Sequence, residues 1–231
     1  MRDAAERLVS SAGAAGPAES AWPTVAEIDA ALAPLARVRF VAGEKSRPRR
    51  RPGRAIEQDG VYEIGIASRR EVPTRPDNLH DLLNALAWAA FPAAKWALTA
   101  RLAEAQRTRL ADRPWRLPGA RTRAHDRLAL LDEGGVLIAS RSPGLAIETA
   151  LARGEARALV FGHALLEHAL EGEVEVWGAA IALPVDPAGS TVELRERLDA
   201  ALASALAGDR LLDAEPWPRI GLRALAVTSP G

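Results

Sequence analysis

Apolar residues recur at helical spacing in several stretches of this chain. The first and the last of these stretches each open with a capping box, in which a hydroxyl and a carboxylate satisfy free amides at a helix start: Thr24–Glu27 and Ser190–Glu193. Between them, Asp77 or Asn78 can cap an apolar-faced segment that runs to Pro92. We therefore expect amphipathic helices over residues 24–34, 79–90, 95–109, 142–153, 162–170 and 190–208.

Other stretches predict strands. Residues 37–41 alternate apolar and polar positions as a half-buried strand does, and residues 60–66, 158–161 and 174–185 are further candidates. In addition, the turn residues Glu133, Gly134 and Gly135 separate two apolar runs, 127–132 and 136–139, which together predict a β-hairpin. The expected fold is α+β, with a mixed or antiparallel sheet that includes this hairpin and is covered by helices.

Length and composition favour one globular domain. Residues 1–21 are rich in Ala, Ser and Gly without periodicity, which predicts a flexible arm followed by a single domain over residues 22–231. Thirty basic and thirty acidic residues cancel, so no overall field attracts nucleic acid or anionic lipid. The basic run 45–54 holds six cations and two prolines, and it predicts a solvated loop more than a nucleic-acid site, because it contains no aromatic residue for base stacking.

The absence of cysteine excludes disulfides, thiolate catalysis and Cys-ligated metals. The chain also contains no signal-peptide-like start and no apolar run of about eighteen residues, so we expect a soluble, cytoplasmic protein without membrane contact. No nucleotide-binding, nucleophile-elbow or zincin motif occurs.

One segment is denser in specific polar residues than the rest: Val72-Pro-Thr-Arg75, Asn78, His80-Asp81, Asn84-Ala-Leu86, Trp88, Phe91-Pro92 and Lys95. This segment resembles the core of a bacterial, proteobacterial family known as domain of unknown function 3025. Residues 126–138 and 161–167 are also similar to that family, so the resemblance covers roughly residues 22–186. It implies no established activity.

His80, Asp81 and Asn84 form the first candidate site. With Asn78 as cap, His80 and Asn84 share one helical face, which suits a metal ligand or a neutral hydrogen-bond donor. Asp81 then falls at the third helical position, where a carboxylate that reaches back to its cap is ordinary architecture.

His163 and Glu167 form the second candidate, because a spacing of four places both on one face, as two metal ligands or as an imidazole oriented by a carboxylate. His168 lies on a different face of that helix. The alternative is that His163 has only a structural role and is hydrogen-bonded to the neighbouring Glu167.

The dipeptide His125-Asp126, together with His80, is similar to the ligand pattern of metal-dependent phosphohydrolases. We reject that reading because those enzymes carry the dipeptide on a helix, whereas Asp126 here opens the expected hairpin. Asp126, Asp132 and Glu133 remain possible acids or ligands, although turn chemistry also explains the last two. Arg75 is either an anion site, with Asn84, beside free helix amides or a clamp on Asp77, Glu63 or a terminus.

Two functions of different class follow. In the first, His80, Asp126 and His163 serve catalysis, and His80, His163 and Glu167 bind a divalent metal for hydrolysis of a small phosphate or acyl compound. In the second, the same residues form a structural polar cluster in a module that binds a small molecule or a protein. The solvent exposure of these residues distinguishes the two functions, because a buried network in which every polar group has a hydrogen-bond partner favours the binding module. The oligomeric state stays open.

Overall fold

A computed structural model describes residues 22–43, 61–112, 122–142, 146–173, 175–208, 210–213 and 216–223. The predicted arm and the basic run 45–54 lie outside these residues. The chain divides into two compact units, of which the first holds residues 1–92 and 102–119 and the second holds residues 93–101 and 120–231. The expectation of a single domain stays a prediction. Among the described helices, none combines the length and the apolar character that crossing a bilayer requires.

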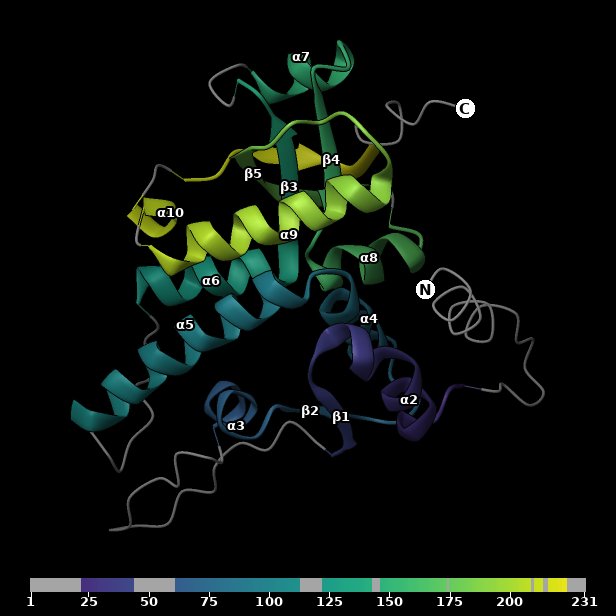
Figure 1. The fold of residues 1–231 in the computed structure, drawn as a ribbon, viewed down its shortest axis with the longest axis vertical. Coiled ribbons are helices and arrows are strands. Elements are labelled where there is room, and N and C mark those ends of the chain that lie inside the picture. The colour runs from purple at the N-terminus through teal and green to yellow at the C-terminus, as the bar shows by residue number, and fades with distance from the viewer. Residues whose placement is uncertain are drawn as a thin grey trace. The chain divides into compact units, whose positions relative to one another are not determined.

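The described part of the first unit holds two helix–strand pairs, a further helix and the C-terminal half of helix α5, which spans Pro92–Asp112 (Figure 1). In chain order the pairs and the further helix are α2 (Val25–Ala36), β1 (Arg39–Ala42), α3 (Tyr62–Arg69), β2 (Glu71–Thr74) and α4 (Leu79–Ala90). Strands β1 and β2 pair in parallel, with Arg39 opposite Glu71. Helix α2 packs on α4 and on β1, and its buried face carries Val25, Ile28 and Leu32, as the helical spacing predicts.

Local signals place most of these boundaries. The capping box at Thr24 and the cap at Asn78 are both confirmed. The strand predicted over residues 60–66 is wrong, because this segment begins helix α3. Its apolar residues alternate in sequence, but Val61 and Ile64, three apart, lie together on a helix face and pack against the C-terminal half of helix α5.

Helix α5 (Pro92–Asp112) follows α4 directly, with Phe91 as the residue between the two helices. Proline is well suited to the first helical position, since it lacks the amide hydrogen that would be unsatisfied there. The next amides, of Ala93 and Ala94, donate to the Asp199 carboxylate at 3.1 and 2.7 Å. A carboxylate from helix α9 (Thr191–Ala207) therefore caps the start of α5.

The second unit is a four-stranded mixed sheet with helices packed on it (Figure 1). The sheet order is β4 (Ala156–Val160), β3 (Gly135–Ser140), β5 (Trp177–Pro184) and β6 (Arg219–Gly221). Strand β3 runs parallel to β5 and antiparallel to β4. All six residues of β3 are buried, which makes this strand the centre of the core. In chain order, the described helices and strands of the second unit are α6 (Arg123–Gly134), β3 (Gly135–Ser140), α7 (Ile147–Ala152), β4 (Ala156–Val160), α8 (His163–Leu170), β5 (Trp177–Pro184), α9 (Thr191–Ala207), α10 (Arg210–Asp213) and β6 (Arg219–Gly221).

The α+β class and the mixed sheet covered by helices are confirmed, but the hairpin over residues 127–139 is wrong. Residues up to Gly134 are helical, and only then does β3 begin. Leu128 and Leu131 are buried three residues apart, while Leu130 is 50% exposed, so the run has a helical period. The two glycines join a helix to a strand, and β3 meets its antiparallel neighbour β4 only after α7.

Candidate functional site

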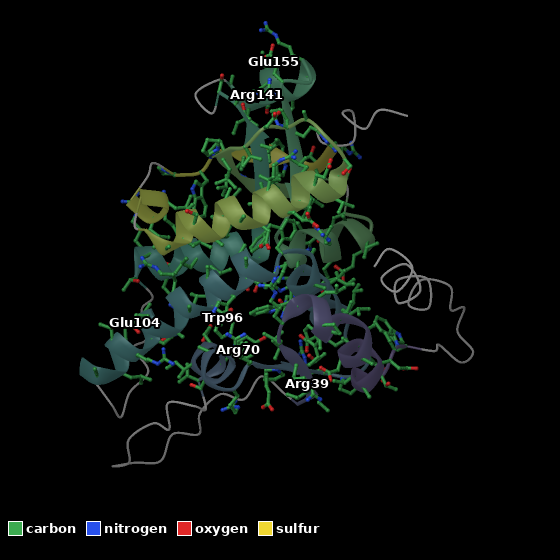
Figure 2. All side chains as sticks on the ribbon, viewed as in Figure 1. Arg39, Arg70, Trp96, Glu104, Arg141 and Glu155 are labelled. Atoms are coloured by element: carbon green, nitrogen blue, oxygen red, sulfur yellow. The ribbon has the colours of Figure 1, made fainter. Side chains whose placement is uncertain are left out.

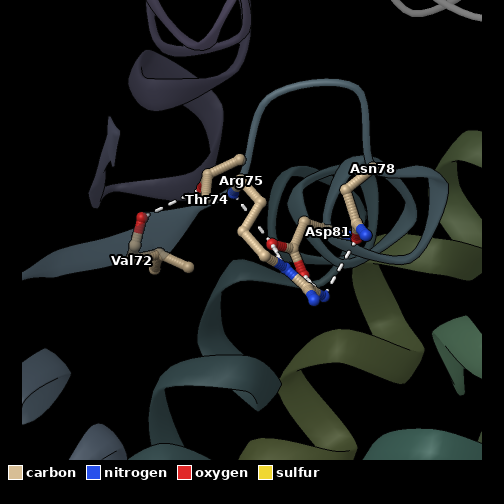
Figure 3. A network of polar contacts seen from close by, with 5 residues as sticks. All are labelled: Val72, Thr74, Arg75, Asn78 and Asp81. Carbon is tan, nitrogen blue, oxygen red and sulfur yellow. Dashed lines mark hydrogen bonds and ion pairs between the residues drawn. The ribbon is translucent and has the colours of Figure 1, made fainter. Parts of the chain in front are cut away.

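In the first unit, a polar network joins the end of β2 to the start of α4 (Figure 3). The Asn78 side chain accepts from the Asp81 amide at 2.9 Å and so caps the helix. Asp81 in turn accepts from the Arg75 amide at 2.8 Å and from the Arg75 guanidinium at 2.9 and 3.0 Å. The guanidinium also donates to Asn78 at 3.1 Å, so one arginine ties the strand end to the helix cap.

These contacts give Arg75 a clamping role. The Asp81 side chain is only 2% exposed and engages the guanidinium through both oxygens, the geometry that makes such pairs strong. The clamped acid is thus Asp81, which was not among the three partners that the sequence suggested. Asp81 does reach back from the third helical position, although to the amide of Arg75 instead of its own cap. Anion binding by Arg75 and Asn84 stays a prediction.

In the second unit, His163 is the first residue of α8 and its side chain is 2% exposed. Its Nδ1 donates to the backbone carbonyl of Asp132 at 3.0 Å, and its Nε2 lies 3.3 Å from Oε2 of Glu133. The Glu133 side chain is half-exposed, so the histidine is reached from one side by a solvated carboxylate. His163 and Glu133 therefore form a pair at the junction of α6 and β3.

The acid next to Glu133 holds a buried cation. Nζ of Lys95 lies 2.5 Å from Oδ1 of Asp132, and the lysine side chain is only 3% exposed. A buried ammonium is costly unless it is paired, so this contact stabilises Lys95 and fixes the Asp132 side chain. Asp132 thus contacts Lys95 through its carboxylate and His163 through its carbonyl.

Close backbone packing sets the position of His163. The carbonyl of Gly135 accepts from the amides of both Phe161 and Gly162, at 3.0 and 2.9 Å. A Cβ added at Gly162 would lie 2.5 Å from the carbonyl oxygen of Glu133 and 2.5 Å from the amide nitrogen of Gly135. Only glycine lets the turn before α8 approach the α6–β3 junction this closely.

The tautomer of His163 follows from its partners. A carbonyl can only accept, so Nδ1 carries the hydrogen and Nε2 of a neutral ring presents a lone pair. That lone pair faces the Glu133 carboxylate, another acceptor. The two atoms are 3.3 Å apart, longer than the usual N–H···O distance of about 2.9 Å, and a cation between them would meet one ligand atom from each side chain.

The remaining predicted residues lie as follows. His80 is half-buried and Asn84 buried on α4 of the first unit, whereas His163 and Glu167 lie on α8 of the second. Since the two histidines belong to different units, a shared ion stays a prediction. His168 is exposed and pairs through Nδ1 with Glu173 at 2.8 Å.

His125 is buried and Asp126 exposed, and both lie on helix α6. The argument that a hairpin separates this dipeptide from the phosphohydrolase pattern is therefore wrong, although the mixed sheet still differs from an all-helical bundle. A catalytic role for Asp126 stays a prediction.

Sequence reasoning missed Lys95 and gave Glu133 too little weight. Lys95 is the last residue of the polar-rich segment and directly follows the apolar run 91–94. That position next to an apolar run is a signal for a buried, paired lysine. Glu133 was attributed to a turn, because the helix that carries it was not foreseen.

A hollow of about 1090 Å³ lies at the other end of β3, beside Ser140 and the start of α9. Figure 2 shows Arg141 and Glu155 at this end of the sheet. Arg141 donates to Asp186 at 2.6 Å, and this hydrogen bond holds the pKa of the Asp186 carboxyl below its ordinary value. Among the described residues, three arginines and two acids line the hollow, so their charges nearly balance.

Comparison with known proteins finds one family. A model of that family, described as Protein of unknown function (DUF3025), matches residues 52–223. No curated protein and no solved structure matches the chain. The match covers most of the chain, including the Arg75 clamp and the junction that holds His163, and the protein therefore belongs to the DUF3025 family.

Proposed function

We propose that the protein is a metal-assisted hydrolase of a small phosphate or acyl compound, and that His163 and Glu133 bind its divalent cation. The observation that carries the proposal is the pair of facing acceptors, Nε2 of His163 and Oε2 of Glu133. A hydrogen bond from a buried imidazole to a backbone carbonyl is the usual device that directs the other nitrogen at a metal.

The separation of the two atoms supports this assignment. Nitrogen and oxygen ligands lie about 2.1 Å from zinc. At that radius, two ligand atoms 3.3 Å apart subtend an angle of about 104° at the ion, close to the tetrahedral value. One residue pair thus supplies two adjacent corners of a site, and the half-exposed Glu133 leaves its outer side open to water or substrate.

A divalent ion bound there would polarise a phosphoryl or carbonyl oxygen and lower the pKa of a bound water. In the hydrolysis the water oxygen forms a bond to phosphorus or to the acyl carbon, and the bond to the leaving group breaks. The water loses a proton to a base, and the leaving group takes up a proton. His80 and Asp126 are the sequence-based candidates for these transfers, and His80 and Glu167 for further ligands.

Titration of chelator-treated protein with Zn²⁺ and Mn²⁺, followed by calorimetry, tests the site. His163→Ala and Glu133→Gln should each lower the affinity at least about tenfold, the usual consequence of losing one metal ligand or its support. The matched control is His168→Ala on the same helix. The exposed His168 side chain forms a surface group with Glu171 and Glu173, and the possible ligand atoms of these three residues lie within 4.8 Å of one another.

If His168→Ala removes metal binding and His163→Ala does not, the ion binds at the surface group and the proposal fails. It also fails if the untagged wild-type protein binds neither metal. His80→Ala measures whether His80 contributes to the same ion. Hydrolysis of p-nitrophenyl phosphate and p-nitrophenyl acetate by the metal-loaded protein then distinguishes phosphate from acyl chemistry.

A non-catalytic binding module is the second candidate, and the first unit favours it. The Asp81 carboxylate accepts three bonds from Arg75 and is almost completely buried, which is the pattern of a structural clamp. If the protein binds metal at His163 but hydrolyses neither ester, the ion has a structural role and the binding-module proposal is supported. Location in the cytoplasm remains part of either proposal, and cell fractionation tests it.

A further inference from the structure

Lys95 is a buried cation that reaches the residue next to the proposed ligand Glu133. Its side chain is 3% exposed, and its Nζ lies 2.5 Å from Oδ1 of Asp132. The desolvation of a buried ion pair often exceeds the attraction between its charges, so such pairs add little net stability. Stability alone is therefore a weak reason for a lysine at this position.

The partner of Lys95 lies where a carboxylate is unfavourable. Asp132 and Glu133 both belong to the last turn of α6, which ends at Gly134 and carries no basic residue in that turn. The carboxyl end of a helix is the negative end of its dipole, so an acid there needs a cation beside it. Lys95 supplies such a cation from helix α5. The contact thus stabilises the Asp132 side chain at the end of α6.

The same helical turn also holds the proposed metal ligands. A helix leaves its last four carbonyls without partners inside the helix, and Nδ1 of His163 donates to that of Asp132 at 3.0 Å. Asp132 therefore contacts Lys95 through its carboxylate and the histidine ring through its carbonyl. Glu133 is the next residue, so the 3.3 Å separation between its Oε2 and Nε2 of His163 depends on the same turn.

Helix α5, which carries Lys95, is itself fixed at its start. The amides of Ala93 and Ala94 donate to the Asp199 carboxylate of α9, one turn or less before Lys95. Hydrogen bonds and one ion pair thus connect α9 to α5 and α5 to the end of α6, and all the residues involved belong to the second unit. Through Lys95, the position of one fixed helix start determines the position of another helix end.

We propose that Lys95 is a positioning residue of the metal site, which holds the last turn of α6 through Asp132. It thereby sets the distance and direction between Nε2 of His163 and the Glu133 carboxylate. This inference rests on the proposed function, because the bound ion is what the two ligand atoms must be positioned for. Groups that orient metal ligands without touching the metal change its affinity by about ten- to hundredfold when they are removed.

The test uses the full chain after treatment with chelator. Zn²⁺ binding is measured by calorimetry, and Co²⁺ binding by visible absorption, which reports the coordination geometry. The double variant Lys95→Met/Asp132→Asn removes both charges together, so neither charge of the pair stays buried without the other and the melting temperature should remain close to that of the wild type. It should nevertheless bind Zn²⁺ at least about tenfold more weakly and give an altered Co²⁺ spectrum. A merely structural ion pair predicts wild-type affinity and an unchanged spectrum.

Two further variants complete the experiment. Asp132→Asn alone keeps the side-chain volume and the backbone carbonyl, and it should weaken Zn²⁺ binding in the same direction, which provides a measurement if the double variant does not fold. Arg141→Met/Asp186→Asn is the matched control, because it removes an ion pair at the other end of β3 by the same two kinds of substitution and should leave Zn²⁺ binding unchanged.

The outcomes separate this inference from the proposed function. If the wild type binds neither Zn²⁺ nor Co²⁺, the proposed metal site fails and the role of Lys95 fails with it. If the wild type binds Zn²⁺ and the variants of Lys95 and Asp132 bind it equally well with the same Co²⁺ spectrum, only the positioning role is overturned. It is also overturned if the control loses as much affinity as the double variant, since the effect would then be general.

Discussion

Gly162→Ala tests the close approach that positions His163. The new methyl group would lie 2.5 Å from two backbone atoms, the Glu133 carbonyl oxygen and the Gly135 amide nitrogen. Ordinary contacts begin near 3.4 Å, so the two segments must separate by most of 1 Å. Because Gly162 has φ of −69°, alanine meets no torsional penalty and the clash alone determines the outcome.

Overpacking of this kind costs about 1–3 kcal/mol, and the lower entropy of unfolded alanine offsets only about 0.4–1 kcal/mol of it. We therefore expect a net loss of about 1–2 kcal/mol, which lowers the melting temperature by roughly 2–8 °C in a chain of this size. Circular dichroism melts measure it. Separation of the two segments should also move His163 away from Glu133 and weaken metal binding in the titration described above.

Gly208→Ala is the matched control. Gly208 ends α9 with φ of −108°, and among the described residues no atom beyond its own chain neighbours lies within 4 Å of a Cβ placed there. This variant should be neutral or slightly stabilised. Equal melting temperatures for the two variants would refute the reasoning, because the close contact would then have no energetic consequence.

Two other substitutions have defined outcomes. Asp199→Ala leaves the amides of Ala93 and Ala94 without their carboxylate, and we expect a loss of about 1–2 kcal/mol in urea unfolding; an unchanged midpoint would mean that water replaces the cap. The hydrogen bond from Arg141 lowers the pKa of Asp186 in the folded protein. The contribution of this bond to stability is therefore complete above the ordinary pKa of 3.8 and is lost as the pH falls through the lowered pKa. The difference in melting temperature between wild type and Asp186→Asn should thus be largest near neutral pH and should disappear in acid. Because both side chains of the pair are exposed, 1 M salt should also reduce this difference. A difference that does not change with pH would contradict the reasoning.

Helix starts were predictable because their determinants are local. Thr24, Asn78 and Ser190 each cap a helix through a side chain that reaches only three residues ahead, and all three are confirmed. Strand and helix were confused at residues 61–66 and 127–134, where short apolar runs fit either period. What decides there is packing against distant residues, such as Leu110 against Ile64, which no local pattern contains.

The candidate sites show the same division. Asn78 was placed correctly at the cap of α4, since its side chain acts over one helical turn, whereas the Asp81 carboxylate bonds Arg75 beyond that turn. The partner of His163 was expected four residues ahead, yet its Nε2 faces Glu133, thirty residues earlier in the chain. Lys95 finds Asp132 in the same way, through the fold of the second unit and not through a motif.

The parallel pairing of β1 with β2 has a kinetic consequence. Each strand has only four residues, and a two-stranded sheet of this size is marginal by itself. No hairpin can start the pairing, because the bond from the Arg39 amide to the Arg70 carbonyl joins residues thirty-one positions apart. The chain must close that long loop before any of these bonds forms, so the strands become ordered only when their helices dock. The first unit should accordingly gain its sheet in one cooperative step, and hydrogen exchange at Arg39 and Phe40 should report the opening of the whole unit instead of local fraying.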